Sequence, residues 1–158
     1  MMALAFKAQP PAPVAGLYET DYSRWLFENA RLLGEGRFAE ADIANVMEEL
    51  EDMGRSEYRA IESHLSVLLL HLLKWEFQPQ QRGNGWRGSI FNSRRAIAKR
   101  LKESPSLRGR LVEVLREAYP DARYNAANET GLPDSAFPAE CPYHVDEALN
   151  PGFWPGAE

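Results

Sequence analysis

The chain has 158 residues, of which 44% are hydrophobic and 26% are charged, and its formal net charge at pH 7 is −5. A chain of this length buries roughly 70% of its unfolded surface, which predicts one hydrophobic core that needs no disulfide or metal to hold it. The negative net charge argues against a protein whose surface is covered with phosphate-binding lysines.

The compartment follows from cysteine usage and from the apolar runs. The lone Cys141 has no partner for an intrachain disulfide, and the apolar start over residues 1–7 is too short for a secretory signal. The longest apolar run, residues 65–70, falls far short of the roughly 20 residues that span a bilayer. We therefore expect a soluble, cytoplasmic protein with no membrane partner.

The charges are segregated along the chain. Residues 38–63 contain eight acidic residues and two arginines, whereas residues 82–102 contain seven cations and no acid. The simplest expectation is that these two blocks neutralise each other when the chain folds.

The chain begins with a segment that has no regular period. Residues 1–16 contain three prolines, so we expect a flexible arm there. Residues 17–158 are expected to form a single helical domain that includes the C-terminal tail. Order begins near Leu17, and the first helix, which Thr20 or Asp21 can cap, ends at the two glycines of residues 34–36. The positions that recur at helical spacing are Tyr22, Trp25, Leu26, Asn29, Ala30 and Leu33.

Two further apolar stripes follow, one on each side of Gly54, and they are not in phase. The change of phase predicts a break or kink at Gly54, with Ser56 able to cap a new helix. Residues 65–73 are apolar nearly all round the helix, so we expect protein to surround them. The first stripe contains Ile43, Val46, Met47, Leu50 and Met53, bordered by Glu49 and Glu51; the second contains Tyr58, Ile61, Leu65, Leu68, Leu72 and Trp75.

The remaining helices are separated by clear turn signals. Trp86, Ile90, Ile97 and Leu101 define a fourth helix, and Ser104-Pro105 opens a fifth that ends at Thr130-Gly131. Pro120 should kink or restart this fifth helix. The proline-rich remainder leaves room for one or two helical turns over residues 144–149, and no segment alternates like a strand. We predict an all-α bundle of about five main helices with an extended C-terminal tail, packed on the bundle through Phe137, Tyr143, Phe153 and Trp154.

Short motifs are spread along the chain after residue 16. They are Leu17-Tyr18 with Asp21 and Trp25, Glu48-Glu49-Leu50 with Met53-Gly54, His71-Leu72-Leu73-Lys74-Trp75, Trp86, Ser104-Pro105-Ser106-Leu107, Glu129-Thr130-Gly131-Leu132-Pro133, Cys141-Pro142-Tyr143 and Phe153-Trp154-Pro155. Together they resemble the twenty-ninth of the domain-of-unknown-function families, which is common in cyanobacteria and other bacteria. The resemblance implies an α-helical fold and a bacterial, cytoplasmic setting. It brings no agreed activity, cofactor or catalytic residue. Pro120 departs from the family's pattern, in which we expect the fifth helix to be continuous, and it bears on the shape of that helix.

His71 is the first candidate for chemistry, because an imidazole inside an apolar helix needs hydrogen-bond partners. With Glu49 or Glu51 orienting it as a base and Arg94 stabilising an anion, it predicts a small hydrolase or nuclease-like enzyme. The alternative, a hydrogen-bonded core histidine, is favoured because such groups are common in structural networks. A second expectation is that Glu49 or Glu51 pairs directly with Arg94.

The acidic helix also has a spacing at which oxygen ligands could meet one Mg²⁺ or Mn²⁺ ion. The pairs are Glu48 with Asp52 and Glu49 with Asn45. Acidic residues on a helix usually form a solvated face, and no metal-binding motif occurs, so no metal and no cofactor are assigned.

The fourth helix is the candidate binding surface. Arg95, Lys99 and Lys102 share one stripe, with Trp86 and Arg87 nearby, which is compatible with weak nucleic-acid binding. A solvated face is favoured over nucleic acid because the whole chain is acidic. Without a competent catalytic set, the leading hypothesis is a noncatalytic helical module that binds another protein or a second copy of itself.

Overall fold

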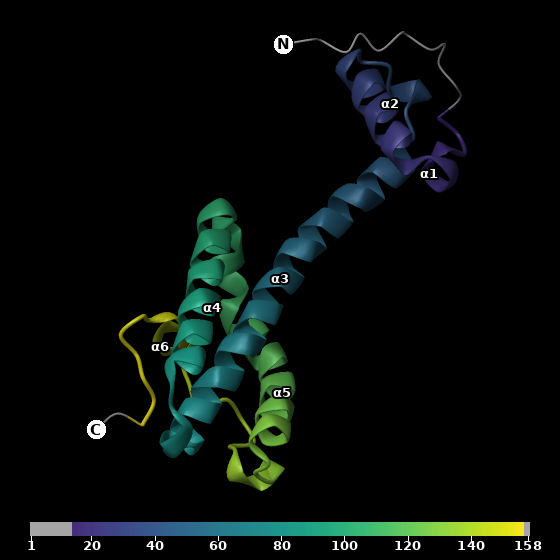
Figure 1. Cartoon of the computed structure of the whole chain (residues 1–158). Helices are drawn as coiled ribbons and strands as arrows, with labels where there is room; N and C mark the ends of the chain where they lie inside the picture. Colours follow the sequence, from purple (N-terminus) through teal and green to yellow (C-terminus); the bar gives the residue numbers. More distant parts are fainter. Residues whose placement is uncertain (1–13, 157–158) are drawn as a thin grey trace, which may run out of the picture. The chain divides into compact units, whose positions relative to one another are not determined.

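The protein is helical throughout the part that is described. The structure is a computed structural model that describes residues 14–156, and no strand occurs among them, which confirms the all-α prediction (Figure 1). Short 3₁₀ turns lie at Phe38–Glu40, Pro79–Gln81, Pro105–Arg110 and Asp134–Ala136. The α-helices are α1 (Leu17–Thr20), α2 (Tyr22–Gly34), α3 (Ile43–Phe77), α4 (Asn84–Glu103), α5 (Leu111–Thr130) and α6 (Val145–Leu149).

The chain divides into two compact units, one up to Gly54 and one from Arg55 onward, and α3 contributes to both. The predicted arm over residues 1–16 lies outside the described residues except for its last three positions. Of these, Val14 is buried in the core of the first unit. The single domain expected over residues 17–158 stays a prediction.

The first unit is built around Trp25 of α2. Asp21 caps this helix by accepting a hydrogen bond of 3.1 Å from the backbone N–H of Arg24. The indole N–H of Trp25 donates to the carboxylate of Asp42 at 3.0 Å, and the buried Asn29 side chain accepts from the backbone N–H of Asp42 at 2.8 Å. These polar contacts attach α2 to the segment from which α3 begins.

Helix α3 passes through Gly54 without interruption, so the predicted break there is wrong. Glycine keeps its backbone N–H and C=O, and in a helix interior it costs only about 1 kcal/mol relative to alanine. One continuous helix can therefore carry both apolar stripes. The expectation that protein surrounds residues 65–73 is wrong at one position, because Val67 is 42% exposed.

The second unit has its core where the C-terminal half of α3 packs against α4 and α5 (Figure 1). Its buried side chains include Leu65, Leu68 and Leu72 of α3, with Ile90 and Ile97 of α4. Helix α5 completes the layer with small residues, which let the helices approach closely. These residues are Ala118, Ala122 and Ala126.

The junction between α4 and α5 differs from the sequence expectation in two details. Ser104-Pro105 opens a 3₁₀ segment, and α5 begins only at Leu111. Helix α5 then continues through Pro120, so the helix is not restarted there. It ends at Gly131, whose φ of 71° is the left-handed conformation that glycine adopts without strain.

The tail packs on the second unit as predicted. Phe137 and Tyr143 are buried, and Phe153 and Trp154 are half-buried against the same core. The rings of Trp75 and Trp154 lie 4.7 Å apart, and those of Phe77 and Phe137 lie 5.3 Å apart. Aromatic contacts of this kind add roughly 0.5–1.5 kcal/mol beyond the burial of their area.

Candidate functional site

His71 has a backbone partner. Its Nδ1 lies 2.8 Å from the carbonyl oxygen of Val67, one turn earlier on α3, and the ring is half-buried. A histidine held by its own helix is anchored in place, which matches the structural reading of this residue more closely than the catalytic one.

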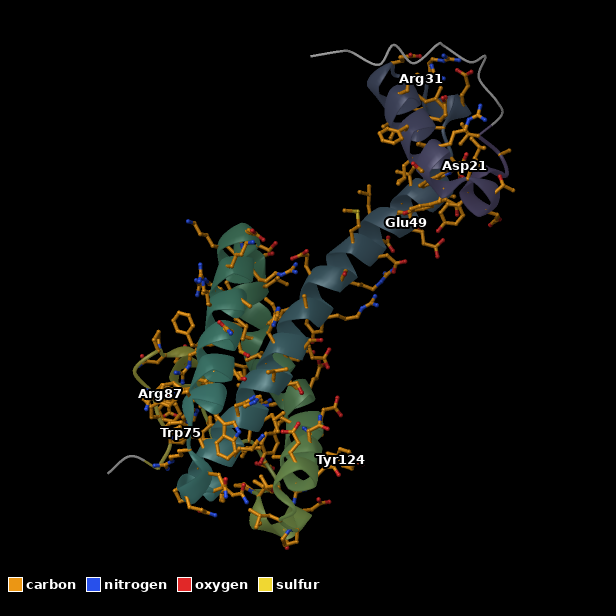
Figure 2. The ribbon with its side chains drawn as sticks, in the orientation of Figure 1. Asp21, Arg31, Glu49, Trp75, Arg87 and Tyr124 are labelled. Carbon is orange, nitrogen blue, oxygen red and sulfur yellow. The ribbon has the colours of Figure 1, made fainter. Side chains whose placement is uncertain are left out.

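Glu49 belongs to the first unit and is held by two tyrosines. The hydroxyls of Tyr18 and Tyr22 donate to its two carboxylate oxygens at 2.5 and 2.7 Å. These bonds lower the pKa of Glu49, and the bond to Tyr18 raises the pKa of that phenol to about 12. Glu49 therefore stays ionised and joins α1 and α2 to α3, in the region where Figure 2 labels it.

Arg94 is one of the few buried charges, and its partners lie in the tail. Its Nε donates to the carbonyl of Ala148 at 2.8 Å and its Nη2 to that of Phe153 at 2.7 Å, while Nη1 lies 3.4 Å from the carbonyl of Pro151. The guanidinium also faces the ring of Trp154 at 5.6 Å. Backbone carbonyls of the tail therefore supply partners for the Arg94 donors, in place of the carboxylate of Glu49 or Glu51 that we expected.

The members of the predicted catalytic set have different partners within their own units. His71, Glu49 and Arg94 each have a separate group of partners, and Glu51 lies exposed on α3. Among the residues that the structure describes, no group of three or more histidine, cysteine or acidic side chains is placed to hold a metal ion. The catalytic assignment of these residues therefore stays a prediction.

A cavity of about 840 Å³ lies beside α5, where the chain leads into α6. Its lining includes Tyr119, Cys141 and Tyr143. The hydroxyl of Tyr143 donates a hydrogen bond to Glu76 at 2.5 Å. Burial raises the pKa of the Cys141 thiol, so this thiol is protonated at neutral pH and is a poor nucleophile. The lining also includes the charged side chains of Arg116, Glu140 and Asp146, together with His144.

The predicted binding residues lie on α4 and fall into two groups. Trp86 is half-buried with the Lys74 ammonium 4.8 Å from the centre of its ring, and Arg87 lies over the rings of Trp75 and Trp154 at 5.7 and 5.6 Å (Figure 2). The second group is Arg95, Lys99 and Lys102, which are exposed and with the exposed Phe91 form what we call the basic α4 face.

A second surface lies on the N-terminal half of α3. Met47, Leu50 and Met53 are 56%, 63% and 65% exposed, although their spacing is that of a core-facing stripe. Only Val46 of this stripe packs on the core of the first unit. Together with Glu51, which is exposed at the border of the stripe, the three residues form what we call the acidic α3 face.

Comparison with known protein families matches residues 17–154 to the family described as domain of unknown function DUF29. The chain belongs to the DUF29 family. No curated protein and no solved structure matches it. The sequence resemblance is confirmed, and it adds no activity to what the DUF29 fold displays.

The acidic α3 face of this DUF29 chain is the feature that sequence reasoning missed. Helical periodicity gives the direction of an apolar face but not what covers it, so the stripe in the sequence does not show that it is exposed. Within the described residues no helix is both long and apolar enough to cross a membrane.

Proposed function

We propose that this DUF29 protein is a noncatalytic helical module that binds another protein through the acidic α3 face. The observation that carries the proposal is the exposure of Met47, Leu50 and Met53 in one stripe on α3. Isolated exposed apolar residues are normal, but neighbouring large ones on a single face are typical of an interaction site.

The shape and chemistry of the face support a helix-packing mode of binding. Residues at positions i, i+3 and i+6 of α3 present Met47, Leu50 and Met53 to the same side. An apolar face of this kind packs into the groove of a partner or against its helix, and methionine adapts to uneven surfaces.

The enzyme hypothesis has no observation in its favour. His71 bonds to its own helix and Arg94 to the tail, and each contact by itself accounts for the position of the side chain. Cytoplasmic location and the absence of a cofactor remain parts of the proposal, and they rest on the lone Cys141 and on the lack of a ligand-binding motif.

The test is capture by crosslinking in lysate from cells that express the protein, with identification of the crosslinked partners. The Leu50→Gln, Met53→Gln variant should lose a protein, or a second copy of this chain, that the wild type captures. Tyr124→Gln is the matched control, because Tyr124 is an isolated exposed aromatic on α5, 66% accessible, and should leave capture unchanged (Figure 2). Identical partners for all three proteins would refute the proposal.

A further inference from the structure

We infer that the basic α4 face binds single-stranded nucleic acid, with an unpaired base stacked on Phe91 and the backbone phosphates paired with the cations around it. This activity goes beyond the proposed function, because it uses a surface of the second unit and a different class of partner. The charge of the whole chain favoured a solvated face at this helix, and the division of the chain into two units changes that argument.

The net charge of −5 is distributed unequally between the two units. Residues 1–54 contain ten acidic and four basic residues, a net charge of −6, whereas residues 55–158 contain thirteen acidic and fourteen basic residues, a net charge of +1. Charges farther apart than about 10 Å are largely screened at 0.1 M salt, so a ligand on α4 responds to the charges nearest to it rather than to the total. The acidic excess belongs to the first unit, and the unit that contains α4 is close to neutral.

The basic α4 face carries a run of positive charge. Arg95, Lys99 and Lys102 follow one another at spacings of four and three residues, which keeps them on one side of the helix. No acidic residue occurs from 82 to 102, and Glu103 is the last residue of α4. Protein surfaces usually mix the two signs of charge, so a run of one sign attracts a partner of the opposite sign.

The cations of this face are available to a ligand. Within residues 14–156 neither Arg95 nor Lys102 forms a salt bridge, and both are exposed. Lys99 lies 4.0 Å from Glu103 with 76% of its side chain exposed, a contact of little energy in water. In contrast, Arg100, which follows on another side of the helix, is already paired with a carboxylate, that of Glu57 at 2.8 Å.

Phe91 adds an exposed aromatic ring to the same side of α4. Its side chain is 60% exposed, and it is not among the side chains that pack on the core of the second unit. Arg87 lies one helical turn before it and Arg95 one turn after it, so the ring has a guanidinium group on each side along the helix. A base can stack on this ring while the phosphates on either side of the base meet the two arginines.

Arg87 is held in position before a ligand arrives. Its guanidinium carbon lies 5.7 Å from the centre of the Trp75 ring and 5.6 Å from that of Trp154, and its side chain is exposed (Figure 2). The planar fork of arginine matches the geometry of a phosphate group, and a side chain that is already positioned loses less freedom on binding. Arg87 therefore extends the cationic surface beyond Phe91 toward the start of α4.

The dimensions of this surface suit a short single strand. From Arg87 to Lys102 it covers about 22 Å at 1.5 Å per residue, and stacked nucleotides lie about 3.4 Å apart, which gives room for roughly six nucleotides. Bases in a duplex stack on one another and cannot stack on Phe91, so a single strand is favoured. Every base has a π face, so we expect little sequence preference.

Single-stranded nucleic acid also fits better than an anionic membrane or an acidic protein. Phe91 is the only large exposed hydrophobic side chain of α4, all of whose residues are described, whereas a helix that lies on a membrane buries a broad apolar face. The carboxylates of an acidic protein would pair with the cations and leave the ring without a flat partner. A nucleotide supplies both the negative charge and the ring.

Fluorescence anisotropy tests the inference, with a labelled strand of about twelve thymidines titrated with the purified full chain. At 50 mM salt the wild type should bind with a dissociation constant in the micromolar range. Each phosphate contact contributes about −0.7 to the slope of log affinity against log salt, and we expect three or four contacts. The affinity should therefore fall about 20- to 50-fold between 50 and 200 mM salt.

Two sets of variants separate the contribution of charge from that of the ring. Arg95→Glu with Lys99→Glu should bind at least tenfold more weakly and with a shallower salt dependence. Phe91→Ala should bind the single strand at least fivefold more weakly with the same salt dependence, and should bind the same strand in a duplex as the wild type does, while Phe91→Trp should retain binding. Arg59→Glu with Arg116→Glu is the charge-matched control on α3 and α5, where both arginines are exposed, and it should bind like the wild type. An unchanged urea midpoint shows that each variant is folded.

The outcomes separate this inference from the proposed function. The Leu50→Gln, Met53→Gln variant should bind the strand like the wild type, and loss of binding there would overturn the assignment to α4. A wild type that does not bind at 50 mM salt overturns the inference and leaves the proposed function standing. Undiminished binding by Phe91→Ala, or equal losses in the α4 charge variant and its control, also overturns it. Binding to vesicles that contain phosphatidylserine, by a protein that does not bind the strand, would overturn it and assign the face to lipid headgroups.

Discussion

Replacing Arg94 by lysine should release the C-terminal tail. Arg94 makes two short hydrogen bonds to the carbonyls of Ala148 and Phe153 and a longer one to Pro151. A hydrogen bond to a charged group contributes roughly 1.5–3 kcal/mol, and a lysine ammonium cannot reach both short partners because it lacks the planar fork of arginine. Burial lowers the pKa of Arg94, so relief of desolvation offsets part of the loss. We expect the free energy of unfolding to fall by about 2–4 kcal/mol in total.

Urea unfolding followed by tryptophan fluorescence measures this loss, because Trp75, Trp86 and Trp154 all belong to the second unit. With a slope of about 2 kcal/mol per molar urea, the midpoint should fall by roughly 1–2 M. Limited proteolysis should then cleave the variant ahead of the wild type between α6 and the C-terminus. Arg95→Lys, one residue away and exposed, is the control and should change stability by less than about 0.5 kcal/mol. An Arg94→Lys midpoint equal to that of wild type, with an equally protected tail, would refute the reasoning.

Three further predictions each concern a single residue. Gly54→Ala should raise stability by about 0.5–1 kcal/mol, because the position is helical and has open space for a methyl group; a lower urea midpoint would contradict this. Asn29→Ala should lower the free energy of unfolding by about 1–3 kcal/mol, measured by thermal melting, because Asn29 accepts from the backbone N–H of Asp42 and donates to the Trp25 carbonyl, both at 2.8 Å. A decrease under about 0.5 kcal/mol would show that these hydrogen bonds are replaceable. Burial raises the pKa of Tyr119 from 10.0 to about 12, so between pH 10 and pH 12 the unfolded chain loses a proton that the native state keeps. Stability should therefore fall as pH rises through this range, and Tyr119→Phe should make the fall of the urea midpoint shallower; an equal slope would refute the assignment.

Most of the secondary structure was predictable because its signals are local. Helical spacing gave α2, α4 and α5, the glycine of Thr130-Gly131 gave the end of α5, and the prolines after residue 132 gave the extended tail. Gly54 and Pro120 were misread for a local reason too. Both residues disfavour a helix, yet the packing and hydrogen bonds of the surrounding turns outweigh that cost.

The candidate sites were less predictable, because their partners are remote in sequence. Arg94 was correctly expected to need partners, but whether carboxylates or tail carbonyls supply them depends on a contact more than fifty residues away. The same holds for Glu49, whose tyrosines lie on α1 and α2. Periodicity identified Leu50 and Leu68 alike as members of apolar stripes, although Leu68 is buried and Leu50 is exposed.

The sequence by itself determined the helices, their amphipathic directions, the segregation of charge and the aromatic tail, since each depends on residues within a few turns of one another. Only the tertiary structure decided that Leu68 is buried and Leu50 exposed, and that Arg94 holds the tail. Burial is a property of what packs against a face, and that is settled by residues far along the chain, which no local pattern encodes.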